Sequence, residues 1–202
     1  MRRILLVNPD TDSDVKAFRE FFAPMLRFLD RRAYMAPLPL ATLAALTPDD
    51  WEVEIWDEPV HGLVNYATNL KSYELVGVTG YMSQIRGARR VADFFRRQGV
   101  RTVAGGPGVS GTPEFLRDAF DSLIVGEAEE IWQPFLRDVK AGSPRKEYRL
   151  IAKPDLSKAP PPRWDILAGD MKHYMAGGVQ TSRGCPFDCE FCQVSFLNGR
   201  GD

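Results

Sequence analysis

Leu75-Val76-Gly77-Val78-Thr79-Gly80 is a short apolar run that ends in glycine. Its length suits a buried strand rather than a helix, and the glycine that follows marks a tight turn. Ile4-Leu5-Leu6-Val7 near the N-terminus has the same apolar character and is followed by Asn8-Pro9. Because both runs lack the alternation of a half-exposed strand, we expect them in the centre of a sheet that is covered on both faces.

Further runs of strand character follow the same plan. They span 51–56, 102–104 and 123–125, and the first of them alternates apolar and polar residues as an edge strand does. Between the runs, apolar residues recur at helical spacing over 14–30, 40–46, 84–98 and 128–140. Strands that alternate with helices predict an α/β fold, a doubly wound parallel sheet of the five strands found here, Rossmann-like in its layering.

Two details qualify the expected helices. Pro24 lies inside the segment 14–30, so we expect it to kink or split that helix. The segment 84–98 carries five arginines on the face opposite its apolar residues, which we interpret as a solvated helix face.

Glycines follow several of the expected strands. Gly80, Gly105, Gly106 and Gly126 all come directly after a strand. The carboxyl ends of parallel strands meet at one edge of the sheet, and open α/β sheets bind their ligands there. This edge is therefore the predicted binding edge, although turn glycines occur in any doubly wound domain and are individually weak signals.

The composition excludes several classes of protein. Lys and Arg together number 26 and Asp and Glu number 27, so the net charge is −1 and gives no general attraction to nucleic acid. No apolar run reaches the roughly 18 residues that a membrane helix needs. The apolar stretch 4–7 is shorter than the roughly 7–15 residues of a signal-peptide core, so we expect a cytoplasmic protein without a transmembrane segment.

The strongest motif is Cys185-Pro186-Phe187-Asp188-Cys189-Glu190-Phe191-Cys192, which contains all three cysteines of the chain. Three thiolates on one loop can surround an iron–sulfur cluster, which normally takes four, and would leave one iron open for a ligand. Two other readings stay open: a structural zinc site with His173 as the fourth ligand, and three inert buried cysteines.

The stretch Ser182-Arg183-Gly184 with the cysteine motif resembles the signature of the radical S-adenosylmethionine enzymes. This resemblance implies a [4Fe–4S] cluster held by Cys185, Cys189 and Cys192. It also implies that S-adenosyl-L-methionine binds the open iron, that Phe191 lies against its adenine, and that an electron donor such as flavodoxin or ferredoxin is a partner.

The first part of the chain resembles the cobalamin-binding domain of one branch of that superfamily, the hopanoid C-2 methylase-like proteins. The resemblance rests on 3–8, 37–40, 43–46, 76–81, 105–107, 125–129, 154–157 and 162–165. It implies cobalamin contacts at Thr79, Gly80, Tyr81, Ser83, Gly105, Gly106, Gly126 and Glu127. Since the first strand is not followed by an Asp-x-His-x-x-Gly motif, we expect neither His61, a surface loop residue, nor His173 to coordinate cobalt.

These observations predict three segments. Residues 1–140 form the cobalamin-binding domain, the proline-containing stretch 141–177 is a linker, and 178–202 begins the radical domain with a strand at 178–182. Because only ten residues follow Cys192, we expect an N-terminal fragment that is inactive alone.

The resemblance implies an enzyme when the protein is whole. The expected reaction is methyl transfer to an unactivated carbon of a small-molecule substrate that is apolar or lipid-like. Two alternatives remain: a stand-alone corrinoid-binding module without catalysis, and an oxidative cyclase or ring-rearranging enzyme of the same branch.

Overall fold

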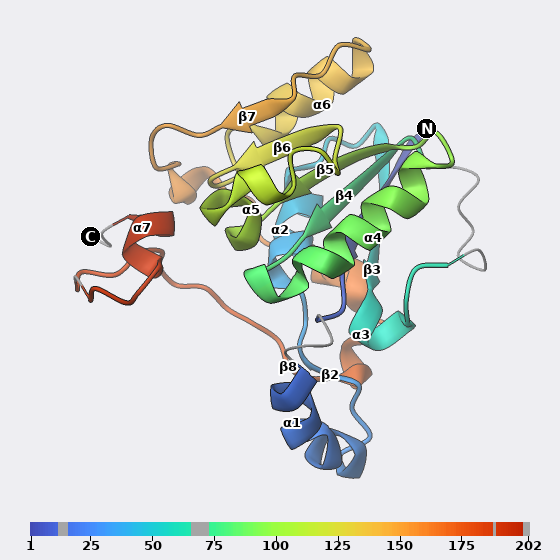
Figure 1. The fold of residues 1–202 in the computed structure, drawn as a ribbon, viewed down its shortest axis with the longest axis vertical. Helices are drawn as coiled ribbons and strands as arrows, with labels where there is room; N and C mark the ends of the chain where they lie inside the picture. Colours follow the sequence, from blue (N-terminus) through green and yellow to red (C-terminus); the bar gives the residue numbers. More distant parts are fainter. Residues whose placement is uncertain (12–15, 66–72, 188, 200–202) are drawn as a thin grey trace.

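The fold is built on one parallel sheet. The computed structural model describes residues 1–11, 16–65, 73–187 and 189–199. The main sheet has six strands in the order β3-β1-β4-β5-β6-β7, and every pair in it is parallel (Figure 1). The strands are β1 (Arg2–Asn8), β3 (Trp51–Asp57), β4 (Leu75–Thr79), β5 (Arg101–Gly105), β6 (Ser122–Val125) and β7 (Glu147–Arg149). The α/β prediction is confirmed, and the sheet has one strand more than expected.

Helices cover both faces of the sheet, as predicted. The apolar side of α4 (Ile85–Arg96) packs on one face together with α5 (Pro107–Gly111). Helices α2 (Leu38–Leu46) and α6 (Trp132–Lys140) pack on the other face. The remaining elements are α1 (Lys16–Phe28), α3 (Glu58–His61), α7 (Val194–Asn198) and the short 3-10 turns η2 (Met82–Gln84), η3 (Pro113–Phe115), η4 (Leu156–Lys158), η5 (Trp164–Leu167) and η6 (Met171–His173).

The chain changes direction at the centre of this sheet. From β1 it passes first to β3 on one side and then to β4 on the other. Between two neighbouring strands whose connections leave in opposite directions, a crevice forms at the carboxyl ends, and doubly wound proteins bind ligands there. Asn8 and Thr79 end β1 and β4 at this point.

A second, two-stranded sheet was not expected from the sequence. β2 (Ala33–Met35) pairs with β8 (Tyr174–Ala176) and lies with α1 beyond the main sheet (Figure 1). The strand predicted at 178–182 is wrong, since those residues form no regular element and Val179 is exposed. The strand that pairs with β2 begins four residues earlier, at Tyr174, whose ring is buried.

Two other expectations need correction. α1 continues through Pro24 and is not split there; residues 14 and 15 of the predicted helix lie outside the described residues. The arginine face of α4 is not simply solvated. Arg90 pairs with the buried carboxylate of Glu58, and Arg96 donates to the carbonyls of Asp118 and Ala119. Over the described ranges, no helix has the length and apolar character needed to cross a bilayer.

We expect Phe135→Ala to lower the free energy of unfolding by about 3–5 kcal/mol. The Phe135 ring is fully buried between Trp132 and Tyr148, with ring centroids 5.4 and 5.2 Å away. Its removal would leave a cavity under α6. Urea unfolding of the variant measures the loss, and Phe28→Ala, at an exposed ring, is the control with an expected change within about 0.5 kcal/mol. Equal effects of the two substitutions would contradict this packing.

Candidate functional site

The turns after β4 and β5 touch each other at the carboxyl edge. The Gly108 amide donates to the Gly80 carbonyl at 2.9 Å. A Cβ on Gly108 would lie 2.9 Å from that same oxygen, and a Cβ on Gly106 would lie 2.7 Å from Thr79 Oγ1. Gly106 also has φ +97°, which a residue with a side chain adopts only with strain. These positions therefore admit only glycine, and backbone lines the edge.

A narrow pocket lies between the two turns. Most of the predicted cobalamin contacts after β4 and β5 line its mouth, namely Thr79, Gly80, Tyr81 and Gly105, together with Gly108. Its inner wall is apolar and consists of Val78, Ile85, Ala88, Ala104, Val109 and Leu116. Predicted contacts Ser83 and Gly106 lie next to these residues in sequence, Ser83 half-buried in η2. The pocket has a cavity volume of about 10 Å³, which is too small for a cofactor group, so a ligand would lie against the backbone edge at its mouth.

Gln84 fixes the β4 turn and was missed by sequence reasoning. Its side-chain amide donates to the Pro9 carbonyl at 2.6 Å and to Asn8 Oδ1 at 3.1 Å. Its Oε1 accepts from the Tyr81 amide at 2.9 Å. Gln84 thus ties the end of β1 to the turn after β4, while the Tyr81 ring itself is 63% exposed above the edge. Gln84 was missed because a single buried glutamine in the turn after β4 belongs to no periodic pattern in the sequence.

The turn after β6 meets the segment that precedes the cysteines. Arg183 contacts Glu127 at 2.7 Å and Glu129 at 2.5 Å, and all three side chains are largely buried. Burial alone would lower the pKa of Arg183, but the carboxylates of Glu129 and Glu127 outweigh it and raise that pKa above its ordinary value. The carboxylate of Glu127, a predicted cobalamin contact, is engaged with Arg183, whereas Gly126 donates its amide to Ser110 Oγ at 2.9 Å.

The cysteine motif forms a loop between β8 and α7. All three thiols are free, Cys189 is exposed, and Cys185 and Cys192 are half-buried. The loop is closed by the Cys185 amide, which donates to the Gly199 carbonyl at 3.4 Å, and it turns where Cys192 donates to the Cys189 carbonyl at 3.0 Å. The thiols do not converge on a common point: among the described residues, which leave out Asp188, no three ligating side chains are grouped for a metal.

The chemistry of this donor set nevertheless fits an iron–sulfur cluster. The thiols share one short loop and are not consumed by disulfides, and thiolates are the ordinary ligands of such clusters. Phe191, predicted to lie against adenine, is 92% exposed on the same loop.

Neither histidine of the chain lies in the cysteine loop. His61 is not an exposed loop residue as expected, because it ends α3 and is half-buried. Its Nδ1 accepts from the Asp57 amide at 2.9 Å, and its Nε2 lies 3.0 Å from Asp170 Oδ2. With both ring nitrogens bonded, His61 offers no nitrogen for a metal. His173 lies in η6, apart from the cysteine loop.

Asp57 sits at the carboxyl end of β3 in a buried network. It accepts from Asn8 Nδ2 at 2.7 Å and from the Tyr174 hydroxyl at 2.8 Å. Burial raises the pKa of Asp57, while the hydrogen bonds from Asn8 and Tyr174 oppose the rise. Through Tyr174 and the contact between His61 and Asp170, this network anchors the segment 170–174 to the main sheet.

The raised pKa of Asp57 predicts a pH dependence. A carboxyl group whose pKa is higher in the folded than in the unfolded protein favours folding below its ordinary pKa of about 3.9, and this contribution is lost as the pH rises through the folded value. We expect Asp57→Asn to become more stable relative to the native chain as the pH rises from about 4 to 7. Urea unfolding across this range measures the difference.

Asp165→Asn is the control with the opposite sign. The hydrogen bond from Arg163 lowers the pKa of Asp165, so this substitution removes a contribution that exists only above the ordinary pKa. Its stability relative to the native chain should fall with rising pH. The same trend in both variants would contradict the assignment for Asp57.

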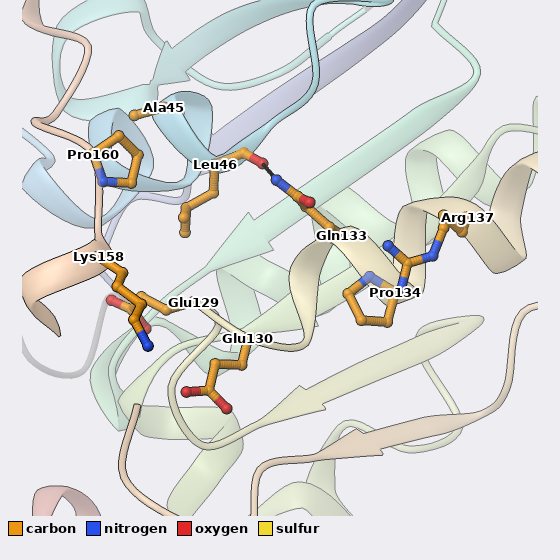
Figure 2. A pocket seen from close by; sticks show the side chains of 9 residues that line it. All are labelled: Ala45, Leu46, Glu129, Glu130, Gln133, Pro134, Arg137, Lys158 and Pro160. Atoms are coloured by element: carbon orange, nitrogen blue, oxygen red, sulfur yellow. Dashed lines mark hydrogen bonds between the residues drawn. The ribbon is translucent and has the colours of Figure 1, made fainter. Parts of the chain in front are cut away.

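A larger pocket lies beside α2 and α6 and shares Glu129 with the contact described above. Figure 2 shows its lining, which comes from the end of α2, the start of α6 and the segment around η4. The pocket has a cavity volume of about 410 Å³, and Gln133 Nε2 crosses to the Leu46 carbonyl at 3.3 Å beside it. Glu129 is already paired with Arg183 and Lys158 with Asp155, and the other two charged side chains of the lining, Glu130 and Arg137, have opposite signs, so charge does not select a ligand for the pocket.

The chain is similar to known proteins of one family. The family model for the B12 binding domain matches residues 28–135. Bacteriochlorophyllide d C-8(2)-methyltransferase of Chlorobaculum tepidum is 30% identical over 168 residues, which cover 81% of this chain and 37% of that protein. Hopanoid C-2 methylase of Rhodopseudomonas palustris is 30% identical over 207 residues, 98% of this chain and 37% of that protein.

An uncharacterized methyltransferase of Synechocystis is also 30% identical, over 89% of this chain and 33% of its own length. The chain thus spans about a third of the length of the curated relatives it matches. Its matched region contains the strands β3, β4, β5 and β6 of the main sheet, both contacting turns and the narrow pocket between them. The chain belongs to the B12-binding domain family.

Proposed function

We propose that this chain is the N-terminal part of a cobalamin-dependent radical S-adenosylmethionine enzyme that methylates an unactivated carbon. One observation carries the proposal: the glycine-lined cradle and the thiol loop lie on the same side of the molecule. α7, directly after the cysteines, packs on α5, whose glycines form the cradle. Two cofactors that must cooperate would therefore have neighbouring sites.

Each cofactor has candidate residues. Cobalamin would be held by Thr79, Gly80, Tyr81, Ser83, Gly105, Gly106, Gly126 and the backbone of Glu127. Since a corrinoid is a broad, flat disc with a long tail, it needs an edge free of side chains and a slot below it, and Gly106 and Gly108 keep the edge free. Cys185, Cys189 and Cys192 would hold a [4Fe–4S] cluster, and the exposed ring of Phe191 is free to stack on adenine.

The cofactors supply the difficult chemistry when bound: the cluster with S-adenosylmethionine starts radical chemistry, and cobalamin carries the methyl group. The residues of this chain bind and orient. Gln84 holds the β4 turn in place, and apolar residues from Val78 to Leu116 pack below the two turns. Because both nitrogens of His61 are bonded, we expect that His61 would not coordinate cobalt, and we expect the same of His173, which does not follow a strand of the main sheet.

The names of the relatives guide the proposed substrate. Bacteriochlorophyllide and hopanoid methylating enzymes are among them, and both names denote large, mostly apolar ring systems. We propose an apolar polycyclic substrate for the whole protein.

Anaerobic reconstitution of the full-length protein with iron, sulfide and hydroxocobalamin tests the proposal. We expect roughly four iron and four sulfide per chain. With S-adenosylmethionine that carries a labelled methyl group, we expect label in an apolar product. Product analysis separates methylation from the alternative ring-rearranging reaction of this branch. Purified protein that carries zinc with four protein ligands, and takes up no iron, would refute it.

A further inference from the structure

The side chain of Arg183, just before the cysteine loop, contacts the turn that follows β6 of the main sheet. All three guanidinium nitrogens have partners: Nη1 contacts Glu127 at 2.7 Å, Nη2 contacts Glu129 at 2.5 Å, and Nε donates to Gln180 Oε1 at 2.9 Å. Arg183 is 18% exposed at its side chain, Glu127 14% and Glu129 9%. Only the planar fork of arginine satisfies several partners in this way, and a lysine could not.

This ion pair fixes the position of one segment relative to another. Removing charges from water costs free energy, and only good geometry between the charges offsets that cost. A buried ion pair therefore contributes little net stability, and we interpret it as fixing where the two segments meet. Glu127 and Glu129 follow β6, at the carboxyl edge. Arg183 lies two residues before Cys185, and consecutive Cα atoms are about 3.8 Å apart, so the Cα of Cys185 is within about 7.6 Å of the Cα of Arg183. The first thiol is thereby tethered close to the end of β6.

Gly184 and α7 complete the arrangement. Gly184, between Arg183 and Cys185, has φ +87°, which turns the chain sharply after the ion pair. At the other end of the loop, Leu197 of α7 approaches Gly111 of α5. The loop therefore contacts the domain at two points, one polar and one apolar, on either side of the cysteines.

We propose that Arg183 is a positioning residue that holds the cysteine loop against the end of β6 and so sets the distance between the cluster and the corrinoid. The proposal rests on the proposed function for the identity of the two cofactors. The tether itself is a property of the chain without cofactors. Two readouts therefore test the two parts separately.

The first readout is amide hydrogen exchange of the 202-residue chain, followed in peptides that cover 185–199. We expect Arg183→Gln to speed exchange there by at least about tenfold, because the loop opens when the tether is lost. Arg183→Lys should give an intermediate rate. Since Arg183→Gln leaves two buried carboxylates unpaired and could unfold the chain, the triple variant Arg183→Gln/Glu127→Gln/Glu129→Gln removes the charges together and should show the same faster exchange in a folded chain.

Arg117→Gln is the matched control. Arg117 pairs with Glu147 at 2.7 Å on the exposed side of the sheet, away from the cysteine loop. We expect native exchange at 185–199 in this variant. Exchange in the triple variant equal to that of the native chain would overturn the tether.

The second readout is magnetic coupling in the reconstituted full-length protein. The reduced cluster should broaden the electron paramagnetic resonance signal of cob(II)alamin, and Arg183→Gln should remove the broadening while iron and cobalamin contents stay native. A general loss of stability would lower those contents instead. Unchanged broadening in Arg183→Gln at native contents would overturn the positioning role. Native protein that binds neither cofactor would refute the proposed function, and hydrogen exchange alone would then decide whether Arg183 holds the loop.

Discussion

Gly108→Val is expected to weaken cobalamin binding by about a hundredfold, which corresponds to about 2.8 kcal/mol. The first carbon of the new side chain would lie 2.8 Å from the Tyr81 carbonyl carbon and 2.9 Å from the Gly80 oxygen. Both are backbone atoms, so the clash cannot be relieved by rotating a side chain. The turns after β4 and β5 must separate, and the slot between them loses its shape. Equilibrium titration of hydroxocobalamin, followed by absorbance, measures the affinity.

Gly169→Val is the matched control for this substitution. A Cβ on Gly169 would meet no atom within 4 Å, and Gly169 does not have a positive φ. This variant therefore shows the effect of replacing a glycine by valine where no clash results. We expect native affinity. If Gly108→Val binds cobalamin as tightly as Gly169→Val does, the slot between the two turns does not hold the cofactor.

Cys189→Ala is expected to lower the iron and sulfide content of the reconstituted protein at least about tenfold. Loss of outer-shell partners of metal ligands already costs about 10–100-fold in metal affinity, and a lost thiolate is a larger change. A three-thiolate site has no spare protein ligand to replace it. Iron and sulfide analysis together with the cluster absorbance measures the effect.

Two control variants are needed. One distinguishes the loss of a metal ligand from a disturbance of the loop, and the other distinguishes an iron–sulfur cluster from a zinc site. Ser195→Ala removes a hydrogen bond of 3.0 Å to the Phe187 carbonyl within the same loop and should leave the iron content native. His173→Ala should also leave it native, since the cluster assignment uses no histidine. Full cluster absorbance in Cys189→Ala would show that Cys189 is not a ligand. Metal loss in His173→Ala would favour the zinc site instead.

Local patterns in the sequence predicted the central part of the fold. The apolar run 75–79 with Gly80 becomes β4 and its turn, and the alternating run 51–56 becomes the edge strand β3. Both signals are local, because burial on two faces and burial on one face leave different spacings of apolar residues. The α/β class and the position of the glycine turns at one edge followed from them.

The parts that were missed depend on contacts between residues far apart in the sequence. β7 is only three residues long, and its central residue Tyr148 is buried only because α6 folds back over it. β2 and β8 are separated by more than a hundred residues, so no local pattern reveals their pairing. Short strands that obtain their burial from distant partners leave no periodicity to read.

The site shows the same division. The glycines after the strands predicted a binding edge, and the spacing of the cysteines predicted a metal-binding loop; the residues that hold each cofactor stay a prediction. The contact of Glu127 with Arg183 could not be predicted from the sequence. The two residues are 56 positions apart, and nothing in the sequence distinguishes them from charged residues that are exposed to solvent. Glu127 was expected at the corrinoid, and its carboxylate is instead directed to the segment that leads into the cysteines.

The most direct test of this account is gel filtration of the 202-residue chain after incubation with hydroxocobalamin. We predict that cobalamin elutes with the protein at one molecule per chain, and that Gly169→Val retains it while Gly108→Val does not. If all cobalamin leaves the native chain and elutes in the free fraction, then the carboxyl edge around Gly106 and Gly108 does not hold a corrinoid, and the account is contradicted.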